Sequence, residues 1–241
     1  MKRTLITGAG RGLGLEFARQ CLQRGDTVFA TVRAPADAPA LVDLQAAYGD
    51  KLTIVPLDVA DKDSIEASYQ RVREHTDRLD LLVNNAGIGA ISKNVGDVNA
   101  YRVLGQLDDE RLLFMLRVNA VAPLMIAQRY LDLLQASDAP RVVSISSGRG
   151  SLHDKTTGGS YGYSTSKAAL NMFMRSFAFD VLEFGIINVV INPGWVQTDM
   201  GGSDAELMPE ESIAGILRVV DSLTPADAGR FLDWQGNEHP W

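Results

Sequence analysis

The sequence predicts an α/β fold in which helices cover both faces of a doubly wound parallel sheet of about seven strands. Three observations favour it. Short apolar runs alternate with helical patterns along the whole chain, which is typical of a parallel sheet. Neither a repeat nor a low-complexity linker interrupts the sequence, so residues 1–241 are expected to form one domain. Glycine-rich or polar motifs follow four of the predicted strands, where such sheets bind their ligands.

The strands are predicted from short runs rich in valine, isoleucine, leucine and threonine. These runs cover residues 3–7, 27–32, 52–56, 79–83, 141–146, 186–192 and 230–233. Because helical patterns fill the connections, the strands are expected to run parallel, with their carboxyl ends at one edge of the sheet.

The helical patterns between these runs justify the remaining elements. They cover the glycine loop to about residue 24, and residues 38–48, 61–76, 109–135, 163–184 and 212–223. Gly25 and Gly185 follow two of them as C-caps, and Asp61 or Asp63 is the N-cap of a third. Pro123 is expected to bend the longest helix, because proline has no backbone N–H to donate.

Composition and charge exclude several classes of function. The net charge of −7 argues against nucleic-acid binding, which favours basic surfaces. No apolar run approaches the roughly 18 residues of a membrane span, and the segment 1–7 is too short for a signal peptide. Cys21, the single cysteine, lies in a helical pattern and is expected to pack rather than react. A cytoplasmic protein without a metal site is the expectation.

A glycine-rich loop, Thr-Gly-x-x-x-Gly-Leu-Gly, follows the first predicted strand. Its glycines and the leucine between the last two are Gly8, Gly10, Gly12, Leu13 and Gly14. Glycines allow a tight turn and let a pyrophosphate approach the next helix N-terminus, where free amides favour anions. Glycines also serve plain turns, but the position after the first strand favours a dinucleotide. A P-loop is excluded, because Gly-Lys-Ser/Thr is absent.

The second predicted strand ends without the acid that usually holds an NAD ribose. Arg33 follows that strand instead, and Arg11 projects from the glycine loop. Two guanidiniums and no carboxylate suit a 2′-phosphate, so NADP(H) is preferred over NAD(H). The alternative is that both arginines are simply solvated. Asp58, after the third strand, is a candidate acceptor for the adenine amine or else a residue of a plain turn.

Tyr163 and Lys167 are four residues apart in a predicted helix and therefore share one face of it. A free phenol has a pKa of about 10 and is a poor acid near neutrality. A nearby ammonium favours the phenolate and lowers that pKa, which makes the hydroxyl a usable proton donor or acceptor. Taken alone, the pair is also typical of a solvated helix face. The motifs elsewhere in the chain favour the catalytic interpretation.

Together these motifs resemble the short-chain dehydrogenase/reductase superfamily, in the same order and over nearly the whole chain. The resemblance rests on residues 7–14, 84–87 and 193–198, with Asn119, Ser147, Tyr163 and Lys167. The stretch 158–163 and the ending 231–241 resemble more narrowly its C-factor/sniffer-like carbonyl reductase subgroup. The resemblance implies a Rossmann-type fold and hydride transfer to a ketone or an aldehyde.

The resemblance also implies roles for the residues that match its motifs. Tyr163 would be the general acid in reduction and the base in oxidation. Lys167 would hold the nicotinamide ribose and lower the pKa of Tyr163. Ser147 would hydrogen-bond the substrate oxygen, and Asn119 would hold a water that connects Lys167 to solvent. The other residues expected to line the cofactor are Asp58, Val59, Asn85, Ala86, Gly87, Pro193, Gly194, Val196 and Thr198.

Two features depart from the family's pattern. Ser147 lies 163 − 147 = 16 residues before Tyr163, whereas about a dozen is usual. The longer loop between them is expected to reshape the mouth of the pocket, and Ser146 is the alternative catalytic serine. His153, in that loop, is a candidate substrate contact or a solvated side chain. Ser144 stands where the family usually has asparagine.

The last expectations concern the pocket wall and the assembly. Trp195 is expected to form one wall of the substrate pocket, or to pack beneath the polar segment 199–211, which is a candidate lid. The helix that carries Tyr163 has apolar side chains on more than one face, and the surplus indicates a subunit contact in a homodimer or homotetramer. Those side chains are Met172, Phe173, Met174, Phe177, Phe179 and Phe184.

The predicted function is the reversible, NADPH-dependent reduction of a ketone or an aldehyde to an alcohol, with Tyr163 as the general acid. The expected partner is a small carbonyl or alcohol substrate, and neither nucleic acid nor a membrane. The alternative is an NADP-binding signalling or regulatory protein with vestigial catalysis, because relatives of the C-factor type are linked to signalling. The intact catalytic residues weigh against that alternative.

Overall fold

The structure is a computed structural model that describes residues 1–89 and 97–241. Its core is a sheet of seven parallel strands in the order β3-β2-β1-β4-β5-β6-β7, so the predicted fold class is confirmed. The strands are β1 Arg3–Ile6, β2 Thr27–Val32, β3 Leu52–Pro56, β4 Leu81–Asn84, β5 Arg141–Ile145, β6 Ile187–Asn192 and β7 Phe231–Asp233. Each predicted strand is present, with bounds that shift by two residues at most.

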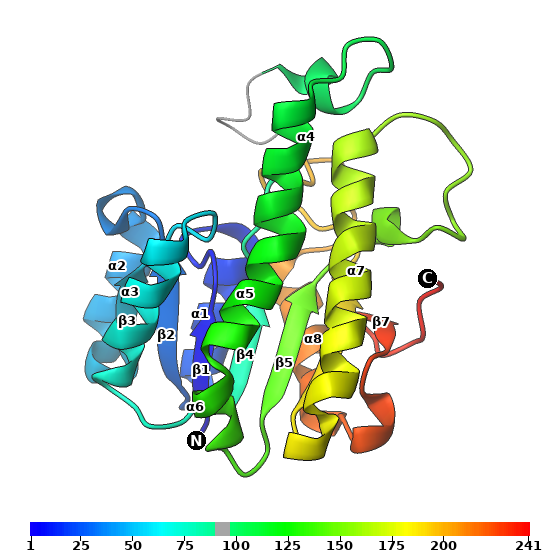
Figure 1. The fold of residues 1–241 in the computed structure, drawn as a ribbon. Coiled ribbons are helices and arrows are strands. Elements are labelled where there is room, and N and C mark those ends of the chain that lie inside the picture. Colours follow the sequence, from blue (N-terminus) through cyan, green and yellow to red (C-terminus); the bar gives the residue numbers. More distant parts are fainter. Residues whose placement is uncertain (90–96) are drawn as a thin grey trace.

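Helices lie on both faces of this sheet (Figure 1). They are α1 Gly12–Gln23, α2 Pro39–Tyr48, α3 Lys62–Arg73, α4 Asp109–Leu116, α5 Ala122–Arg129, α6 Leu131–Gln135, α7 Tyr161–Val181 and α8 Pro209–Ser222. Successive strand residues point to opposite faces. In β1, Ile6 packs with residues of α1, α2 and α8, whereas Leu5 packs with residues of α3, α5 and α7. Because both faces are buried, the strands are apolar on both sides.

The order of the strands indicates where a ligand would bind, at the carboxyl edge of the sheet. β1 lies between β2 and β4, where the chain order of the strands reverses, and such a switch point opens a crevice beyond the strand ends. The register aligns Ile6 with Val83, Val83 with Val143, and Val143 with Val189. The segments that follow β1, β4, β5 and β6 therefore leave the sheet side by side.

The long helix predicted over 109–135 is divided into three helices. A π turn, Arg117–Val121, separates α4 from α5, and Tyr130 separates α5 from α6 with a backbone φ of −93° and ψ of 11°. Pro123 lies just after the π turn and has no N–H for the carbonyl of Asn119, four residues earlier. The irregularity caused by the proline thus falls on the turn that carries Asn119. π turns of this kind recur at functional sites.

Two other predicted helices begin earlier than expected. α7 starts at Tyr161, two residues before Tyr163. α8 starts at Pro209, which takes a first-turn position that suits proline. The last three residues of the predicted lid, 209–211, are therefore helical.

The stretch 88–107, for which neither a strand nor a helix is predicted above, contains the short 3₁₀ turn Val98–Tyr101, and its residues 90–96 lie outside the described part of the chain. Tyr101 packs with Met115 of α4 and with Tyr163 in a small cluster of its own. Among the described residues, no helix combines the length and the apolar character that a membrane crossing requires.

Candidate active site

The loop after β1 and the loop after β4 are joined through Thr7 and Asn85. The Thr7 hydroxyl accepts the backbone N–H groups of Asn85 and Ala86, both at 3.0 Å. The Asn85 side-chain amide donates to the carbonyl oxygens of Thr7 at 2.9 Å and Gly8 at 3.1 Å. Four hydrogen bonds therefore fix the glycine loop against residues 84–87, the Asn-Asn-Ala-Gly motif, which was expected to lie at the same edge of the sheet.

The glycine loop has the close contacts that its composition predicts. Gly8 has φ of +67°, and a Cβ there would lie 2.9 Å from the Ala86 Cα. A Cβ on Gly14 would lie 2.3 Å from the carbonyl oxygen of Gly8. Both positions exclude a side chain, because real Cβ contacts are longer. The turn from β1 into α1 is therefore as tight as a dinucleotide-binding turn must be.

The N-terminus of α1 is suited to an anion. Neither a side-chain cap nor an acidic residue in the first turn is present among the residues described for this helix. Its free backbone N–H groups and the positive end of the helix dipole therefore face the crevice without a protein partner of opposite charge. The tight glycine turn and this uncapped helix end together fit the pyrophosphate of a dinucleotide.

The two candidate phosphate-binding arginines differ in their surroundings. Arg11 donates to the Asp199 carboxylate at 2.6 Å, and both side chains are largely exposed. The glycine loop thereby contacts the predicted lid. Arg33 is exposed just beyond β2, beside the loop, since a Cβ on Gly10 would lie 3.0 Å from Val32. Neither side chain is buried, so either can turn toward a phosphate in the crevice.

Asp58 belongs to a turn. Its carboxylate accepts the backbone N–H of Ala60 at 3.0 Å, and its own N–H donates to the Ser64 hydroxyl at 2.9 Å. Its side chain is exposed, and Val59 next to it packs on the edge of the core. These contacts favour the turn interpretation and leave one carboxylate oxygen of Asp58 available.

Asn119 is buried in the π turn and holds three partners. Its carbonyl oxygen accepts the N–H of Ile88 at 2.8 Å, and its amide donates to the Ile88 carbonyl at 2.8 Å and the Ser166 hydroxyl at 3.0 Å. A Cβ on Gly87 would lie 3.2 Å from Asn119 Oδ1 and 3.8 Å from Lys167 Nζ. The structure therefore brings Asn119, Gly87 and Lys167 together, although they come from three separate segments.

Tyr163 and Lys167 share the inner face of α7, as predicted. Lys167 Nζ is buried, donates to the Ile145 carbonyl at 2.8 Å, and lies 5.8 Å from the centre of the Tyr163 ring. Burial lowers the pKa of Lys167 from its ordinary value to about 8. A sizeable part of this lysine is therefore neutral in mildly alkaline solution.

The predicted lowering of the Tyr163 pKa by Lys167 is wrong for this structure. Burial raises the pKa of Tyr163, and this effect outweighs a hydrogen bond with Ser147 and the charge of Arg149, which both lower it. The Lys167 ammonium is directed at the Ile145 carbonyl instead. The phenol is consequently a protonated group at neutral pH.

The two adjacent serines have different partners. Ser146 is buried and donates to the Asn171 side chain at 2.6 Å. Ser147 is partly exposed, accepts the N–H of Arg149 at 3.2 Å, and lies close enough to Tyr163 for its hydroxyl to lower the pKa of that phenol. Ser147 thus caps a 3₁₀ turn, and residues 147–150 are called the catalytic turn below. The geometry favours Ser147 over Ser146 as the partner of Tyr163.

Beyond β6, a turn at Pro193–Gly194 leads to Val196 and Thr198, two of the residues expected to line the cofactor. The Pro193 carbonyl accepts the Ser212 hydroxyl of α8 at 2.7 Å, and Gly194 has φ of +84°. Val196 is buried, and the Thr198 hydroxyl accepts the N–H of Gly201 at 3.1 Å. A Cβ on Gly12 would lie 3.6 Å from the Thr198 methyl group, so this segment reaches the glycine loop.

Trp195 does not pack beneath the segment that follows it. Its side chain is 56% exposed, and the indole N–H donates to the carbonyl oxygen of Gly201 at 2.9 Å. The ring is thus held by the predicted lid but presents its surface outward. An exposed aromatic ring beside the crevice is available to an apolar substrate.

His153, the candidate substrate contact in the long loop, is bound elsewhere. Its ring is exposed and lies 3.0 Å from the Asp154 carboxylate, and its backbone N–H donates to the Trp241 carbonyl at 2.8 Å. The solvated interpretation is therefore favoured for its side chain. Within the described residues, no group of three or more His, Cys, Asp or Glu is placed to hold a metal ion.

Three neighbours of the site were not predicted from the sequence. The Ser166 hydroxyl joins Asn119 to the Tyr163 carbonyl, to which it donates at 2.8 Å. The Ile145 carbonyl receives Lys167. The charge of Arg149 acts on Tyr163. The position of Arg149 two residues after Ser147 was the one available signal, since backbone carbonyls and a serine within Tyr-x-x-x-Lys have no distinctive pattern.

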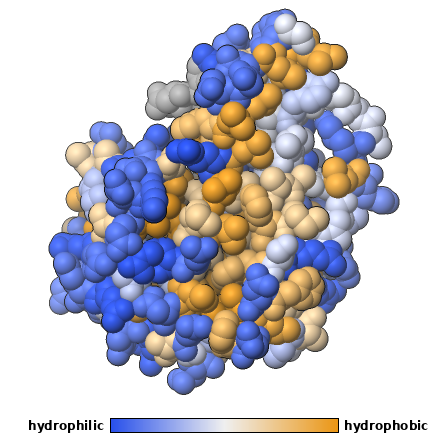
Figure 2. Space-filling model, in the orientation of Figure 1, coloured by the Kyte–Doolittle hydropathy of each residue, from blue (hydrophilic) through white to orange (hydrophobic). Residues whose placement is uncertain are grey.

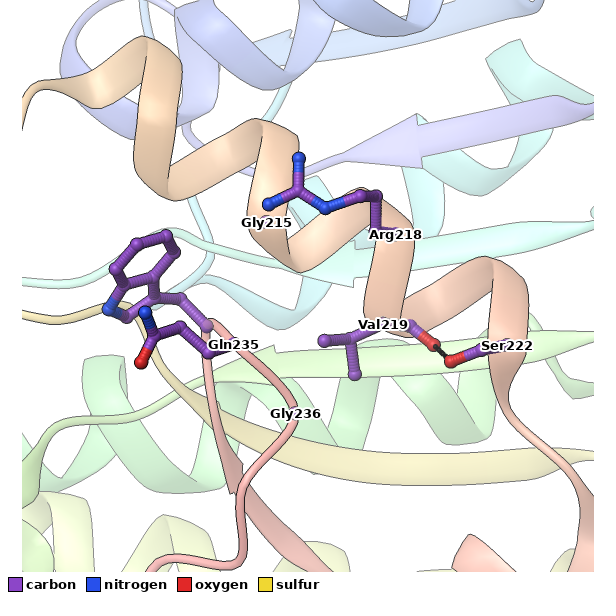
Figure 3. A pocket seen from close by; sticks show the side chains of 7 residues that line it. Gly215, Arg218, Val219, Ser222, Gln235 and Gly236 are labelled. Atoms are coloured by element: carbon purple, nitrogen blue, oxygen red, sulfur yellow. Dashed lines mark hydrogen bonds between the residues drawn. The ribbon is translucent and has the colours of Figure 1, made fainter.

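A hollow of about 400 Å³ lies behind the turn that follows β6. It is lined by Gly215, Arg218, Val219, Ser222, Trp234, Gln235 and Gly236 (Figure 3). A Cβ on Gly194 would lie 3.2 Å from Trp234, whose ring also packs against Gly215. Neither Ser147 nor Tyr163 lines this hollow, so it is separate from the catalytic groups.

Apolar side chains gather on the face of the molecule formed by α4, α5 and α7 (Figure 2). Phe114 of α4 is 49% exposed and Phe173 of α7 is 38% exposed, and helices α4 and α7 are in contact. Phe179 is 61% exposed on another side of α7, where it lies near Trp241. Of the apolar residues predicted to be in surplus, Met174 and Phe177 are buried against the sheet, while Met172 and Phe173 are exposed. The predicted surplus on α7 is therefore present.

Comparisons with known proteins agree with this geometry. The family model described as short chain dehydrogenase matches residues 2–208. C-signal from Myxococcus xanthus is 42% identical over 166 residues, which cover 69% of this chain and 95% of that protein. The NADPH-bound carbonyl reductase from chicken fatty liver matches with a TM-score of 0.90 and 34% identity, over 100% of this chain and 99% of the other. The carbonyl reductase Sniffer of D. melanogaster matches with a TM-score of 0.91 and 31% identity, over 100% of both chains.

Proposed function

Because the chain belongs to the short-chain dehydrogenase family of oxidoreductases, we propose that it reduces a ketone or an aldehyde to an alcohol with NADPH. One observation carries the proposal. Tyr163 stands beside Ser147 at the carboxyl edge of the sheet, with Lys167 and Asn119 close by. The glycine loop lies on the same edge, so a dinucleotide and a carbonyl can meet there.

The cofactor would be held along the edge from the glycine loop to β6. The amides of the glycine loop and α1 would bind the pyrophosphate, and Asn85, Ala86 and Gly87 would line the ribose side. Val196 and Thr198 would hold the carboxamide. When bound, NADPH supplies the hydride for the carbonyl carbon. Lys167 would hold the nicotinamide ribose, for which its buried ammonium is well placed beside Gly87.

The protein's own groups would act on the carbonyl oxygen. The hydroxyls of Ser147 and Tyr163 would hydrogen-bond that oxygen and stabilise the negative charge that grows on it. Tyr163 would then give up its proton. Its raised pKa keeps it protonated at neutral pH, which suits reduction, and general acid catalysis of this kind contributes about 10²–10⁴-fold. Lys167 and a water held at Asn119 would return a proton from solvent.

NADP(H) is proposed over NAD(H) because of the charges beside the glycine loop. Arg33 is exposed at the end of β2, where an acid would otherwise hold the ribose. Arg11 is within reach of the same region and pairs with Asp199, which it can exchange for a phosphate. The NADPH-bound chicken reductase supports this preference by its similarity.

The substrate is proposed to be apolar on one side of its carbonyl. Trp195 is exposed and held by Gly201, and the segment 199–208 would close over the substrate as a lid. An indole ring of this kind gives a large flat contact to an aromatic or aliphatic group.

The test uses two measurements on purified protein. A panel of aromatic and aliphatic aldehydes and ketones is screened for NADPH oxidation, and NADPH binding is followed by fluorescence. Tyr163→Phe should nearly abolish turnover and leave NADPH affinity unchanged. Ser147→Ala should lower kcat about 100-fold, whereas Ser146→Ala should retain most activity. Full turnover in Tyr163→Phe would remove the catalytic assignment.

A second candidate is an NADP-binding signalling protein, favoured by the 42% identity to C-signal. A sensor of that kind needs the glycine loop and the arginines but has no use for Tyr163. Binding of NADPH without turnover of any carbonyl in the panel would favour it over the reductase.

The exposed apolar face of α4, α5 and α7 is proposed to form a homodimer. Phe114, Met125 and Phe173 lie on these helices and are each more than one-third exposed. Burying such side chains against a second copy removes apolar surface from water.

A further inference from the structure

The segment 236–241, called the tail below, returns along the sheet instead of leaving it. Gly236 has φ of +95°, which reverses the chain after β7. The N–H of His239 donates to the Phe231 carbonyl at 2.8 Å, and Glu238 forms an antiparallel bridge with Leu232. The tail is therefore fixed to the edge of the sheet as a short antiparallel strand.

His239 carries this fixed tail to the catalytic turn. Its ring meets the Phe231 ring edge-on, with centroids 4.6 Å apart. Its Nε2 atom faces the turn, since a Cβ on Gly148 would lie 3.2 Å away. Nε2 is buried and makes no hydrogen bond with the described residues, and the Asp154 carboxylate is 3.7 Å away. The imidazole thus packs against the residue next to Ser147.

Trp241 fastens the loop that leaves the catalytic turn. Its carbonyl oxygen accepts the N–H of His153 at 2.8 Å and the hydroxyl of Ser151 at 3.2 Å. Its ring stacks under the Arg175 guanidinium, which lies 4.5 Å from the ring centre, and packs on Phe231. The tail therefore holds the turn through His239 and the following loop through Trp241.

The other side of the turn rests on α7. A Cβ on Gly150 would lie 2.9 Å from the carbonyl carbon and from Cβ of Lys167. The turn is consequently confined between the helix that carries Tyr163 and Lys167 and the tail that carries His239. Since Ser147 caps this turn, its hydroxyl can keep its place near Tyr163 only while both sides are in contact.

We propose that His239 is a positioning residue for Ser147: by packing on Gly148 it holds the catalytic turn against α7, so that the Ser147 hydroxyl and the Tyr163 hydroxyl converge on one substrate oxygen. An effect of His239 on kcat rests on the proposed carbonyl reduction. An effect of His239 on the order of the catalytic turn does not depend on that function. Misplacement of a catalytic group by about 1 Å can lower a rate by up to 10²-fold.

The experiment compares His239→Ala with Glu238→Ala. Glu238 is the preceding tail residue and pairs with Arg230 at 3.1 Å, away from the turn, so its variant is the matched control. Hydrogen exchange of peptides that cover residues 147–154 is measured in each. We expect exchange about tenfold faster in His239→Ala than in the wild type, and no change in Glu238→Ala. Equal exchange in both variants would overturn the proposal.

A double-mutant cycle supplies the kinetic test. His239→Ala should lower kcat about tenfold and leave NADPH affinity unchanged. In a Ser147→Ala background, the same change should lower kcat by less than twofold, because its effect acts through Ser147. An equal loss in both backgrounds would mean a general structural role and would overturn the proposal.

Two further outcomes keep the tests separate. If His239→Ala does not fold, His239→Gln takes its place, since it retains volume but loses the flat ring that fits Gly148. If the wild type reduces no carbonyl, the proposed function fails. The exchange difference between His239→Ala and Glu238→Ala then decides alone whether the tail holds the turn.

Discussion

Lys167 donates to the carbonyl oxygen of Ile145 at 2.8 Å, across the junction between α7 and the end of β5. Ile145 stands two residues before Ser147, and Lys167 stands four residues after Tyr163. This single hydrogen bond therefore ties the segment that carries the serine to the helix that carries the tyrosine. The separation of the Ser147 and Tyr163 hydroxyls, which are proposed to be catalytic, depends on it.

The burial of Lys167 predicts a pH-dependent stability. The pKa of Lys167 is about 8 in the folded chain, whereas an unfolded lysine has a pKa of about 10.4. Between these values the unfolded chain binds more protons, so raising the pH favours the folded state. Below about pH 8 the full penalty of burying the charge is present. We expect the stability of Lys167→Met relative to the wild type to decrease as the pH rises from 8 to 10.

Urea unfolding of both proteins without cofactor at several pH values measures this difference. Lys62→Met is the control, because Lys62 is exposed at the start of α3. The difference in free energy of unfolding between Lys62→Met and the wild type should be the same at every pH. A constant offset for Lys167→Met as well would contradict a lowered pKa of Lys167 in the folded chain.

The charge of Arg149 predicts a shift in the pH profile of alcohol oxidation. In the proposed mechanism that direction needs the Tyr163 phenolate as base, so its rate should rise with pH through the pKa of Tyr163. Arg149 lowers that pKa by its positive charge. Arg149→Met should therefore move the rising limb to higher pH, while Arg149→Lys should leave it in place. Rates with NADP⁺ and an alcohol from the substrate panel measure it, and superimposed limbs for all three proteins would exclude the effect.

Much of the fold was predictable because local patterns and tertiary contacts agree. The predicted strand bounds agree with the structure within two residues. The reason is that a parallel strand buried on both faces is a continuous apolar run in the sequence, which glycines and helical segments delimit. The sequence also indicated that Gly8 and Gly14 lie in a tight turn, because at both positions a Cβ atom would clash with neighbouring backbone and only glycine fits. Thr7 and Asn85 follow β1 and β4, two parallel strands that lie side by side in the sheet, so their contact follows from the order of the strands.

The electrostatics of the site were not predictable from spacing. Tyr163 and Lys167 stand one helical turn apart, as expected, but the direction of the lysine was decided by a carbonyl of β5, which no motif marks. The balance between burial and charge on Tyr163 likewise depends on the whole environment. The partner of Ser146, Asn171, comes from the next part of α7, and the contact of the tail with Gly148 joins residues about 90 apart.

The cofactor preference predicts different effects on two dinucleotides. Arg33→Ala should weaken NADPH binding about 10- to 100-fold, because a hydrogen bond to a charged group contributes roughly 1.5–3 kcal/mol. NADH lacks the 2′-phosphate, so its affinity should change less than twofold. Fluorescence titration with both dinucleotides measures the two constants. Arg218→Ala, an exposed arginine on α8, is the control. Equal losses for NADPH and NADH would place the 2′-phosphate away from Arg33.

The hydrogen bonds of Asn119 predict that its replacement lowers both the free energy of unfolding and kcat. Asn119→Leu would leave the N–H and the carbonyl oxygen of Ile88, which is partly buried, without their partner. Each unsatisfied buried group costs about 1–3 kcal/mol, so we expect the free energy of unfolding to fall by a few kcal/mol. Chemical unfolding measures it, and kcat in carbonyl reduction should fall in the same variant. An unchanged stability would mean that water replaces both contacts.

The exposed apolar face of α4, α5 and α7 predicts a homodimer that one charged substitution on this face would dissociate. Phe114 is 49% exposed on α4, which forms this face with α5 and α7, so Phe114→Glu places a carboxylate where the second copy would pack. Burying an unpaired charge is far more costly than burying a phenyl ring is favourable. Light scattering after size exclusion should therefore give a dimer mass for the wild type and a monomer mass for the variant. Val42→Glu, at an exposed position on α2 of the opposite face, should remain dimeric. A monomeric wild type would contradict the proposed dimer.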